Sequence, residues 1–429
     1  MKTSIARLLL VACGFLAQVT LLASSAAAEA LDFSTSVQIV RSGFDGKTCW
    51  SQARAGTIPG KHPIVVLTMQ KMLMSSTDVY FALNETRTAD LGRTWTELVE
   101  HATLGRQAVP DGTISNISDF TPKWHAASGK LLGTGGTSHY RDEKRIDDSP
   151  TQVAYAVYDQ EGRTWSQWQR LKLPSGRQSY HMSAGGAQRV DLTDGTILLP
   201  VYFKDEGINA YRTTVLRCAF DGRTLTYLGH GDDLGLPFNP ALVPQSKDEG
   251  RRVFNARQAG LFEPSLTRFQ GRYFLTMRNR DAGYVASSDD GQRFNTPQVW
   301  AFDDGEPLGN YNTQQHWVTH NDGLFLAYTR RGVANDHVYR HRAPILIARV
   351  DPVRLCIIRS SERILVPERG VDLGNFSVND VNADETWLVT SELMRLSSPA
   401  PKSSGADNHV YAARIIWNRP NRLVDESAR

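Results

Sequence analysis

The sequence predicts an all-β protein whose strands are arranged as a β-propeller. Short runs alternate apolar and polar residues between turns that contain glycine, as antiparallel strands do. One strand–turn–strand unit also recurs at intervals of several tens of residues, which is typical of repeat architectures such as propellers. The clearest run, residues 260–294, holds two alternating segments and a closing turn and predicts one β-meander.

The recurring turn has the pattern Ser/Thr-x-Asp-x-Gly. Residues 87–95 match it at every defined position, with Asp90 as the aspartate, and the turn that closes residues 260–294 supplies Asp289. A third copy carries Gln160 at the aspartate position, and residues 218–225 match the pattern less well. The aspartate can accept backbone N–H bonds within the turn, so we interpret these turns as markers of the fold.

The first 30 residues predict a secretory signal peptide. A basic start precedes an apolar run over residues 8–22, and small residues follow up to Ala30. Cleavage is expected after Ala28 or Ala30, which would leave the protein secreted or periplasmic. A lipid-attached form through Cys13 is the alternative. No later stretch is long and apolar enough to cross a membrane.

The charge balance and the cysteines exclude several classes of protein. Lysine and arginine number 48 against 45 acidic residues, a formal net charge of +3, so the sequence indicates neither nucleic acid nor an acidic membrane as a partner. Cys49, Cys218 and Cys356 show no metal-ligand spacing, and we expect no metal and no other cofactor. One disulfide could form, with its pairing open. We expect a monomer.

Taken in order, the chain from residue 31 to residue 417 predicts a single domain with one closing strand and six blades. The closing strand covers residues 31–41, and the blades cover residues 49–95, 120–165, 180–225, 260–294, 315–351 and 375–417. The second blade contains a charged insertion, residues 139–148, which is either a solvated loop or a loop that touches substrate. Residues 418–429 are expected to form a loose tail.

These turns and their order resemble the sialidase (neuraminidase) superfamily, whose Asp-box or BNR turns belong to a six-bladed propeller. The resemblance covers most of the mature chain. In that family an arginine in an Arg-Ile-Pro motif grips the substrate carboxylate. Here Arg54 precedes Ile58-Pro59 with three extra residues between them. The family's acid/base aspartate lies shortly before the first Asp-box, where this chain has Asp78, and its glutamate opens the fourth-blade meander, where this chain has Glu263.

The resemblance also assigns the other two arginines. The second ends the strand after the glutamate and matches Arg278. The third precedes a fifth-blade strand and matches Arg342, with Arg340 as the fallback. Guanidinium groups bind a carboxylate bidentately and stay charged, and Asp78 and Glu263 would supply acid/base chemistry across a glycosidic bond. From the residues alone, each arginine could instead be a surface ion-pair partner and Asp78 a turn residue.

The chain departs from the family at the nucleophile. Sialidases carry a tyrosine in a Tyr-Ser pair late in the chain, and the matching pair here is Phe376-Ser377. Phenylalanine has no hydroxyl, so another residue supplies the nucleophile, water attacks directly, or the ring is no longer a sialidase.

The sequence leaves three functions open. The first is a secreted exo-glycosidase that hydrolyses a terminal sialic or uronic acid from a glycan, with His181 at the rim as a substrate contact. The second is a polysaccharide lyase in which Tyr180, His181 and Tyr311 abstract and donate protons while Arg278 neutralises a uronate carboxylate. The third is a carbohydrate-binding propeller that has lost the chemistry.

Overall fold

A computed structural model describes residues 30–74, 78–146, 149–175, 180–208, 210–237, 259–394 and 405–427. The predicted signal peptide lies outside these residues apart from its last residue, Ala30, and Cys13 lies outside them as well. No helix in the described ranges is long and apolar enough to span a membrane.

Within the described residues the strands form six antiparallel sheets. The first contains β2 (Thr48–Ile58), β3 (Ile64–Leu73), β4 (Tyr80–Thr88) and β5 (Val99–Glu100). The second contains β6 (Gln107–Ala108), β7 (Ile114–His125), β8 (Lys130–Arg141), β9 (Lys144–Arg145), β10 (Val153–Asp159), β11 (Thr164–Trp165) and β12 (Gln169–Arg170). The third contains β13 (His181–Ser183), β14 (Val190–Asp191), β15 (Ile197–Lys204), β16 (Arg212–Phe220) and β17 (Leu225–His230).

The other three sheets follow in chain order. The fourth contains β18 (Phe262–Phe269), β19 (Arg272–Arg278), β20 (Gly283–Ser288) and β21 (Gln298–Val299). The fifth contains β22 (His316–His320), β23 (Gly323–Tyr328), β24 (Ile345–Asp351), β25 (Cys356–Ile357) and β26 (Arg363–Val366). The sixth contains β1 (Phe33–Arg41), β27 (Asp372–Leu373), β28 (Ser377–Asn382), β29 (Glu385–Leu393) and β30 (Val410–Trp417). The described helices are α2 (Arg422–Ser427) and short 3-10 turns at Ala102–Leu104, Ala126–Ser128, Tyr339–His341 and Arg359–Ser361.

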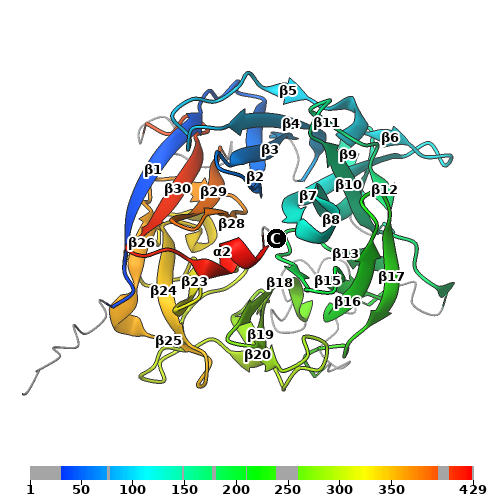
Figure 1. The fold of residues 1–429 in the computed structure, drawn as a ribbon. Helices are drawn as coiled ribbons and strands as arrows, with labels where there is room; N and C mark the ends of the chain where they lie inside the picture. Colours follow the sequence, from blue (N-terminus) through cyan, green and yellow to red (C-terminus); the bar gives the residue numbers. More distant parts are fainter. Residues whose placement is uncertain are drawn as a thin grey trace, which may run out of the picture. The chain divides into compact units, whose positions relative to one another are not determined.

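The sheets are arranged around a central axis, and each packs on the next through a hydrophobic cluster (Figure 1). The cluster between the last sheet and the first closes the series, with Val65 and Leu67 of β3 against Trp387 and Val389 of β29. Val66 points the other way and packs between the first two sheets, as expected when successive strand residues face opposite sides. These contacts confirm an all-β chain with a β-propeller arrangement.

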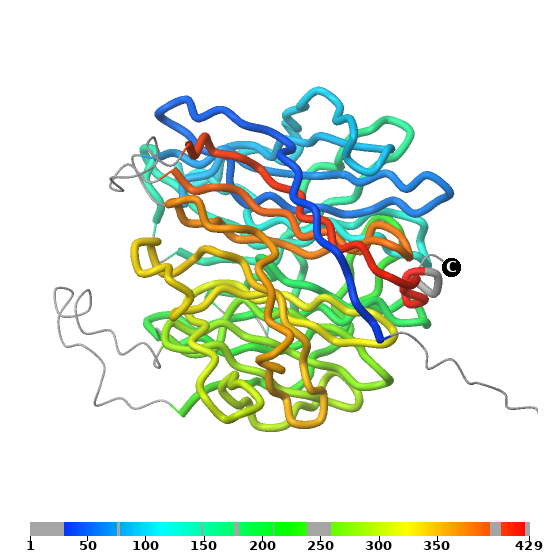
Figure 2. The backbone as a smooth tube through the Cα atoms, turned by 90° about the vertical axis from the view of Figure 1, so that its left-hand side faces the viewer, coloured from blue at the N-terminus to red at the C-terminus, as the bar shows by residue number. Residues whose placement is uncertain are grey.

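The N-terminal strand joins the C-terminal sheet, as expected for a closing strand. β1 pairs antiparallel with β30, from Phe33 opposite Trp417 to Arg41 opposite Val410. Figure 2 shows this blue strand running beside the red one. The last sheet therefore combines strands from both ends of the chain.

The C-terminal segment differs from the predicted loose tail. Asn421 is fully buried, its side chain donates to the carbonyl of Thr319 (2.8 Å), and its backbone N–H donates to the carbonyl of Ala383 (2.6 Å). Helix α2 follows and lies near the central axis in Figure 1. A helix of six residues leaves no periodic signal in the sequence, which is why the prediction missed it.

The turn aspartates behave as hydrogen-bond acceptors, with one shift of register. Asp90 accepts the backbone N–H of Thr94 (2.9 Å), as predicted. In the fourth sheet the acceptor is Asp290, which takes the N–H of Arg293 (2.7 Å), whereas the predicted Asp289 is 92% exposed. The assignment of Asp289 is therefore corrected to the next residue. In the copy with Gln160, the neighbouring Asp159 accepts the N–H of Gly162 instead (3.0 Å).

Candidate active site

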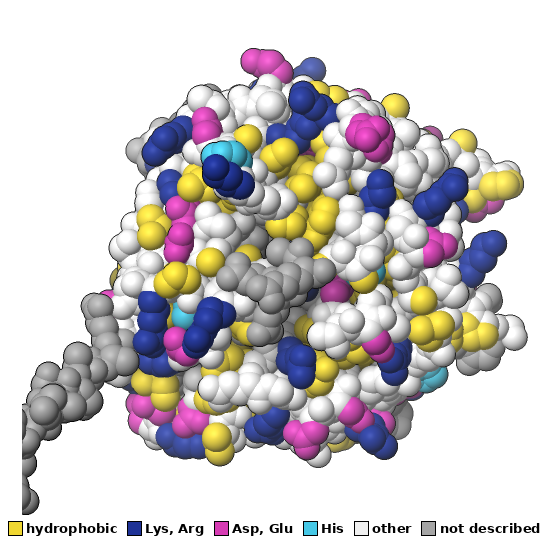
Figure 3. Space-filling model, in the orientation of Figure 1, with side chains coloured by type: hydrophobic (Ala, Val, Ile, Leu, Met, Phe, Trp, Pro, Cys, Tyr) yellow, Lys and Arg dark blue, Asp and Glu magenta, His cyan; other side chains and the backbone are white. Residues whose placement is uncertain are grey.

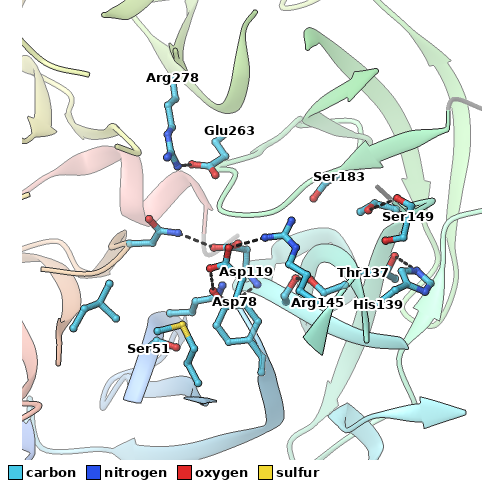
Figure 4. A pocket seen from close by; sticks show the side chains of 18 of the residues that line it. Ser51, Asp78, Asp119, Thr137, His139, Arg145, Ser149, Ser183, Glu263 and Arg278 are labelled. Atoms are coloured by element: carbon cyan, nitrogen blue, oxygen red, sulfur yellow. Dashed lines mark hydrogen bonds and ion pairs between the residues drawn. The ribbon is translucent and has the colours of Figure 1, made fainter. Parts of the chain in front are cut away.

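Residues from the inner strands of several sheets line a cavity of about 540 Å³ (Figure 4). Five of the predicted site residues line it, namely Asp78, His181, Glu263, Arg278 and Arg342. Its other polar and ionisable lining residues are Ser51, Gln52, Tyr80, Ser118, Asp119, Thr137, Ser138, His139, Arg145, Ser149, Thr151, Ser183, Tyr202, Tyr339, Arg340 and Asn375. On the face drawn in Figure 3, basic and acidic side chains are interspersed.

Three inner strands carry the same irregularity at the cavity. The pairing of β2, β7 and β18 shifts register there, and each shift contains a non-glycine residue with positive φ: Gln52 (53°), Asp119 (50°) and Glu263 (45°). Such bulges re-aim a side chain, and backbone strain of this kind is concentrated at functional sites. All three residues line the cavity. Asp119 was missed in the sequence.

Arginines form a positive region beside Glu263. Arg278 donates Nη1 to Glu263 Oε2 (2.5 Å) and Nη2 to the side chain of Asn312 (2.7 Å), and Arg342 donates to the carbonyl of Asn312 (3.1 Å). The Nε atoms of Arg278 and Arg342 are buried and have no hydrogen-bond partner among the described residues. Burial and the neighbouring charge of Arg278 lower the pKa of Arg342 to about 10, which still leaves it charged at neutral pH. The fallback residue, Arg340, lines the same cavity.

Asp78 lies in another part of the cavity, in contact with a hairpin of the second sheet. Its Oδ2 accepts Arg145 Nη1 (2.6 Å) and its Oδ1 accepts the hydroxyl of Tyr80 (3.0 Å). The side chain of Asp78 is 45% exposed, so a ligand in the cavity could reach it.

Arg54 does not reach the cavity, which corrects its assignment as a direct carboxylate ligand. Its side chain is fully buried and donates to the carbonyl of Phe376, to Asp119 Oδ1 and to Gln314 Oε1, each at 2.8 Å. The bulge in β2 places Gln52 at the cavity instead. Arg54 therefore binds Asp119 from the protein interior and helps to position its carboxylate.

The ring of Phe376 is also buried and packs edge-on against His316, with ring centres 5.1 Å apart. The tyrosines that line the cavity are Tyr80, Tyr202 and Tyr339. Burial and then the charge of Glu263 raise the pKa of Tyr202 well above its ordinary value, and both residues line the cavity. Tyr202 was not singled out in the sequence, since its position on the second strand of its sheet matches no motif.

His181 is the one member of the predicted lyase set at the cavity apart from Arg278. Burial lowers its pKa to about 3, and its Nε2 has no hydrogen-bond partner among the described residues. Tyr180 and Tyr311 are not lining residues, and the hydroxyl of Tyr311 bonds to His341 instead (2.6 Å). Tyr180 and Tyr311 therefore do not join His181 among the residues that line the cavity.

Buried neutral histidines predict that the fold loses stability in mild acid. The pKa of His181 is about 3 and that of His316 lies well below its ordinary value, in both cases chiefly through burial, whereas unfolded histidine titrates near 6.5. Below pH ~6.5 the unfolded chain thus binds more protons, and each histidine is expected to lower the free energy of unfolding by about 1.4 kcal/mol per pH unit. Urea denaturation at pH 7.5, 6 and 5 measures this. An unchanged midpoint would contradict it.

No protein-family model matches the chain, and no curated protein matches its sequence. Solved structures do match. The Hadza microbial sialidase Hz136 aligns with a TM-score of 0.60 and 15% identity, over 88% of this chain and 68% of that one. The sialidase of Trypanosoma rangeli, in complex with the inhibitor DANA, aligns with a TM-score of 0.56 and 13% identity, over 89% of this chain and 59% of that one.

A protein of unknown function from Dyadobacter fermentans DSM 18053 aligns over 89% of this chain and 99% of its own length, with a TM-score of 0.55 and 15% identity. Against the Trypanosoma rangeli sialidase, this chain spans less than two thirds of the longer protein. At such identities the likeness concerns the fold, and this chain has a sialidase-like β-propeller fold.

Proposed function

We propose that each of the six sheets is one blade, that the aspartate turns are Asp-boxes, and that the protein is a sialidase-like exo-glycosidase. Its substrate would be a glycan that ends in an anionic sugar, either sialic acid or a uronic acid. The observation that supports this is that Arg278 and Arg342 line the same cavity as Asp78 and Glu263. Guanidinium groups that line a polar cavity can bind a carboxylate through two parallel hydrogen bonds.

In this proposal the carboxylate is bound by Arg278 and Arg342, with Arg340 in the place expected of Arg54. His181 contacts the bound sugar. Asp78 donates a proton to the glycosidic oxygen as the glycosidic bond breaks. It later acts as a base and accepts a proton from the attacking water. Glu263 and Asp119 stabilise the positive charge that develops on the sugar ring.

Glu263 also assists the nucleophile. Two groups could be activated there: a water molecule, or the hydroxyl of Tyr202, which lines the same cavity as Glu263. Tyr202 would replace the hydroxyl that Phe376 lacks. We further propose that the protein is exported through its signal peptide and acts as a monomer without metal, cofactor or nucleic acid.

The test is the purified protein against sialosides and uronate-containing glycans, with reducing ends and ultraviolet absorbance followed together. Glu263→Gln is expected to lower kcat/KM by about 10²–10⁴-fold, because it removes the charge that activates the nucleophile. Wild-type protein that releases no anionic sugar from any of these glycans would contradict the proposal. A Glu263→Gln variant with wild-type rates would contradict the role of this residue.

The lyase is the second candidate, and His181 is the observation that favours it. His181 and Tyr202 line the cavity side by side, with ring centres 5.6 Å apart, and such a pair could serve as base and acid. A lyase would produce an unsaturated uronate and therefore rising absorbance in the same assay. A carbohydrate-binding propeller would produce neither new reducing ends nor ultraviolet absorbance. It would bind an anionic glycan, and replacing Arg278 would weaken that binding.

A further inference from the structure

The hairpin formed by β8 and β9 brings a second cationic group into the cavity. Asp142 and Glu143 connect the two strands, with φ of 50° and 54°. Two-residue hairpins favour positive φ, usually with glycine or asparagine, so this acidic pair adopts the turn at some cost in strain. The hairpin belongs to the charged insertion, whose role the sequence left open, and Arg145 at its end lines the cavity.

The hairpin is fixed to the neighbouring sheet. Arg106 makes a bidentate ion pair with Glu143, at 2.7 and 2.9 Å, and its Nε donates to the carbonyl of Tyr80 (2.9 Å). Tyr80 in turn donates its hydroxyl to Asp78. The same contacts therefore set the position of the hairpin and of Asp78 relative to each other, and Arg145 is held at a defined place beside Asp78.

Arg145 has hydrogen-bonding capacity that the protein leaves open. Its Nη1 donates to Asp78 Oδ2 (2.6 Å), while its Nη2 and Nε meet no acceptor among the described residues. The side chain is 36% exposed, and hydroxyls of Thr137, Ser149 and Thr151 line the same part of the cavity. The Nη2 and Nε donors of Arg145 could bind an anionic group on a sugar, and the nearby hydroxyls could add hydrogen bonds to it.

The two cationic regions lie on different sides of the cavity. Figure 4 shows the pair of Arg278 and Glu263 apart from the pair of Asp78 and Arg145. In a glycosidase the general acid lies on the side of the leaving group, since it protonates the glycosidic oxygen. If Arg278 and Arg342 hold the terminal sugar, Arg145 faces the sugar that leaves.

We propose that Arg145 binds a carboxylate or sulfate on the leaving sugar, so that the substrate is an acidic polysaccharide or oligosaccharide with anionic sugars on both sides of the cleaved bond. This inference rests on the proposed function.

The test compares glycosides that share one acidic terminal sugar and differ in the leaving sugar: a neutral hexose, a uronate, or a sulfated hexose. Arg145→Gln is expected to lower kcat/KM about 10- to 100-fold more for an anionic leaving sugar than for the neutral one, the scale of a lost hydrogen bond to a charged group. The anionic glycoside that suffers the larger loss identifies carboxylate or sulfate as the natural group. Arg145→Lys should recover part of the preference.

Lys144→Gln is the matched control, because Lys144 is exposed on the same strand and does not line the cavity. An equal loss on all three glycosides would mean that Arg145 only positions Asp78, and it would overturn the inference. Calorimetric binding of the same glycosides separates this from failure of the proposed function. If no glycoside is cleaved, a selective loss of affinity of Arg145→Gln for the two anionic leaving sugars would still support the inference, and equal affinities would overturn it.

Discussion

Replacing Asp78 with asparagine is expected to lower kcat/KM by about 10²–10⁴-fold, the usual contribution of a general acid or base. Asparagine has the same size and can still accept the hydroxyl of Tyr80, so the local structure should persist. It cannot donate a carboxylic proton to the glycosidic oxygen. The measurement is steady-state hydrolysis of whichever anionic glycoside the wild-type protein cleaves, together with circular dichroism to verify folding.

The matched control is Asp289→Asn, since the side chain of Asp289 is 92% exposed and does not line the cavity. The control should keep wild-type activity. A reading of Asp78 as a turn residue predicts a different result: Asp78→Asn would lower the melting temperature and leave kcat/KM within about two-fold of wild type. Such an outcome would remove Asp78 from the chemistry and direct attention to Asp119.

The strand pattern could be predicted from the sequence because each strand has one face toward each neighbouring sheet. Val65 and Val66 pack against opposite neighbouring sheets. This alternation produces the two-residue periodicity of the sequence. The turn at Asp90 could be predicted for a similar reason, since its hydrogen bonds are local. The shift from Asp289 to Asp290 could not, because two adjacent aspartates satisfy the same pattern and only the backbone decides which one points inward.

The grouping of the site residues was implied by the resemblance to sialidases in motif order. Asp78 precedes β4, Glu263 lies near the start of β18 and Arg278 ends β19, and the propeller arrangement brings all three to one cavity. Arg54 and Asp119 were assigned wrongly or missed because a bulge changes which residue faces the cavity, and a bulge leaves no signal in a period-two pattern. Tyr202 and Arg145 depend on contacts between distant segments, which no local motif records.

Replacing Arg54 with leucine is expected to lower the free energy of unfolding by about 3–5 kcal/mol, the cost of removing one partner of a buried ion pair. Arg54 is fully buried and gives hydrogen bonds to Asp119, to Gln314 and to the carbonyl of Phe376. Leucine would leave these acceptors unsatisfied, above all the carboxylate of Asp119. Urea denaturation at pH 7.5 measures the change.

The double variant Arg54→Leu with Asp119→Asn separates the ion pair from the loss of packing. Because asparagine carries no charge that needs a partner, the double variant should be more stable than Arg54→Leu alone. If the two substitutions instead add independently, or if Arg54→Leu costs less than about 1 kcal/mol, Arg54 does not hold Asp119 in solution.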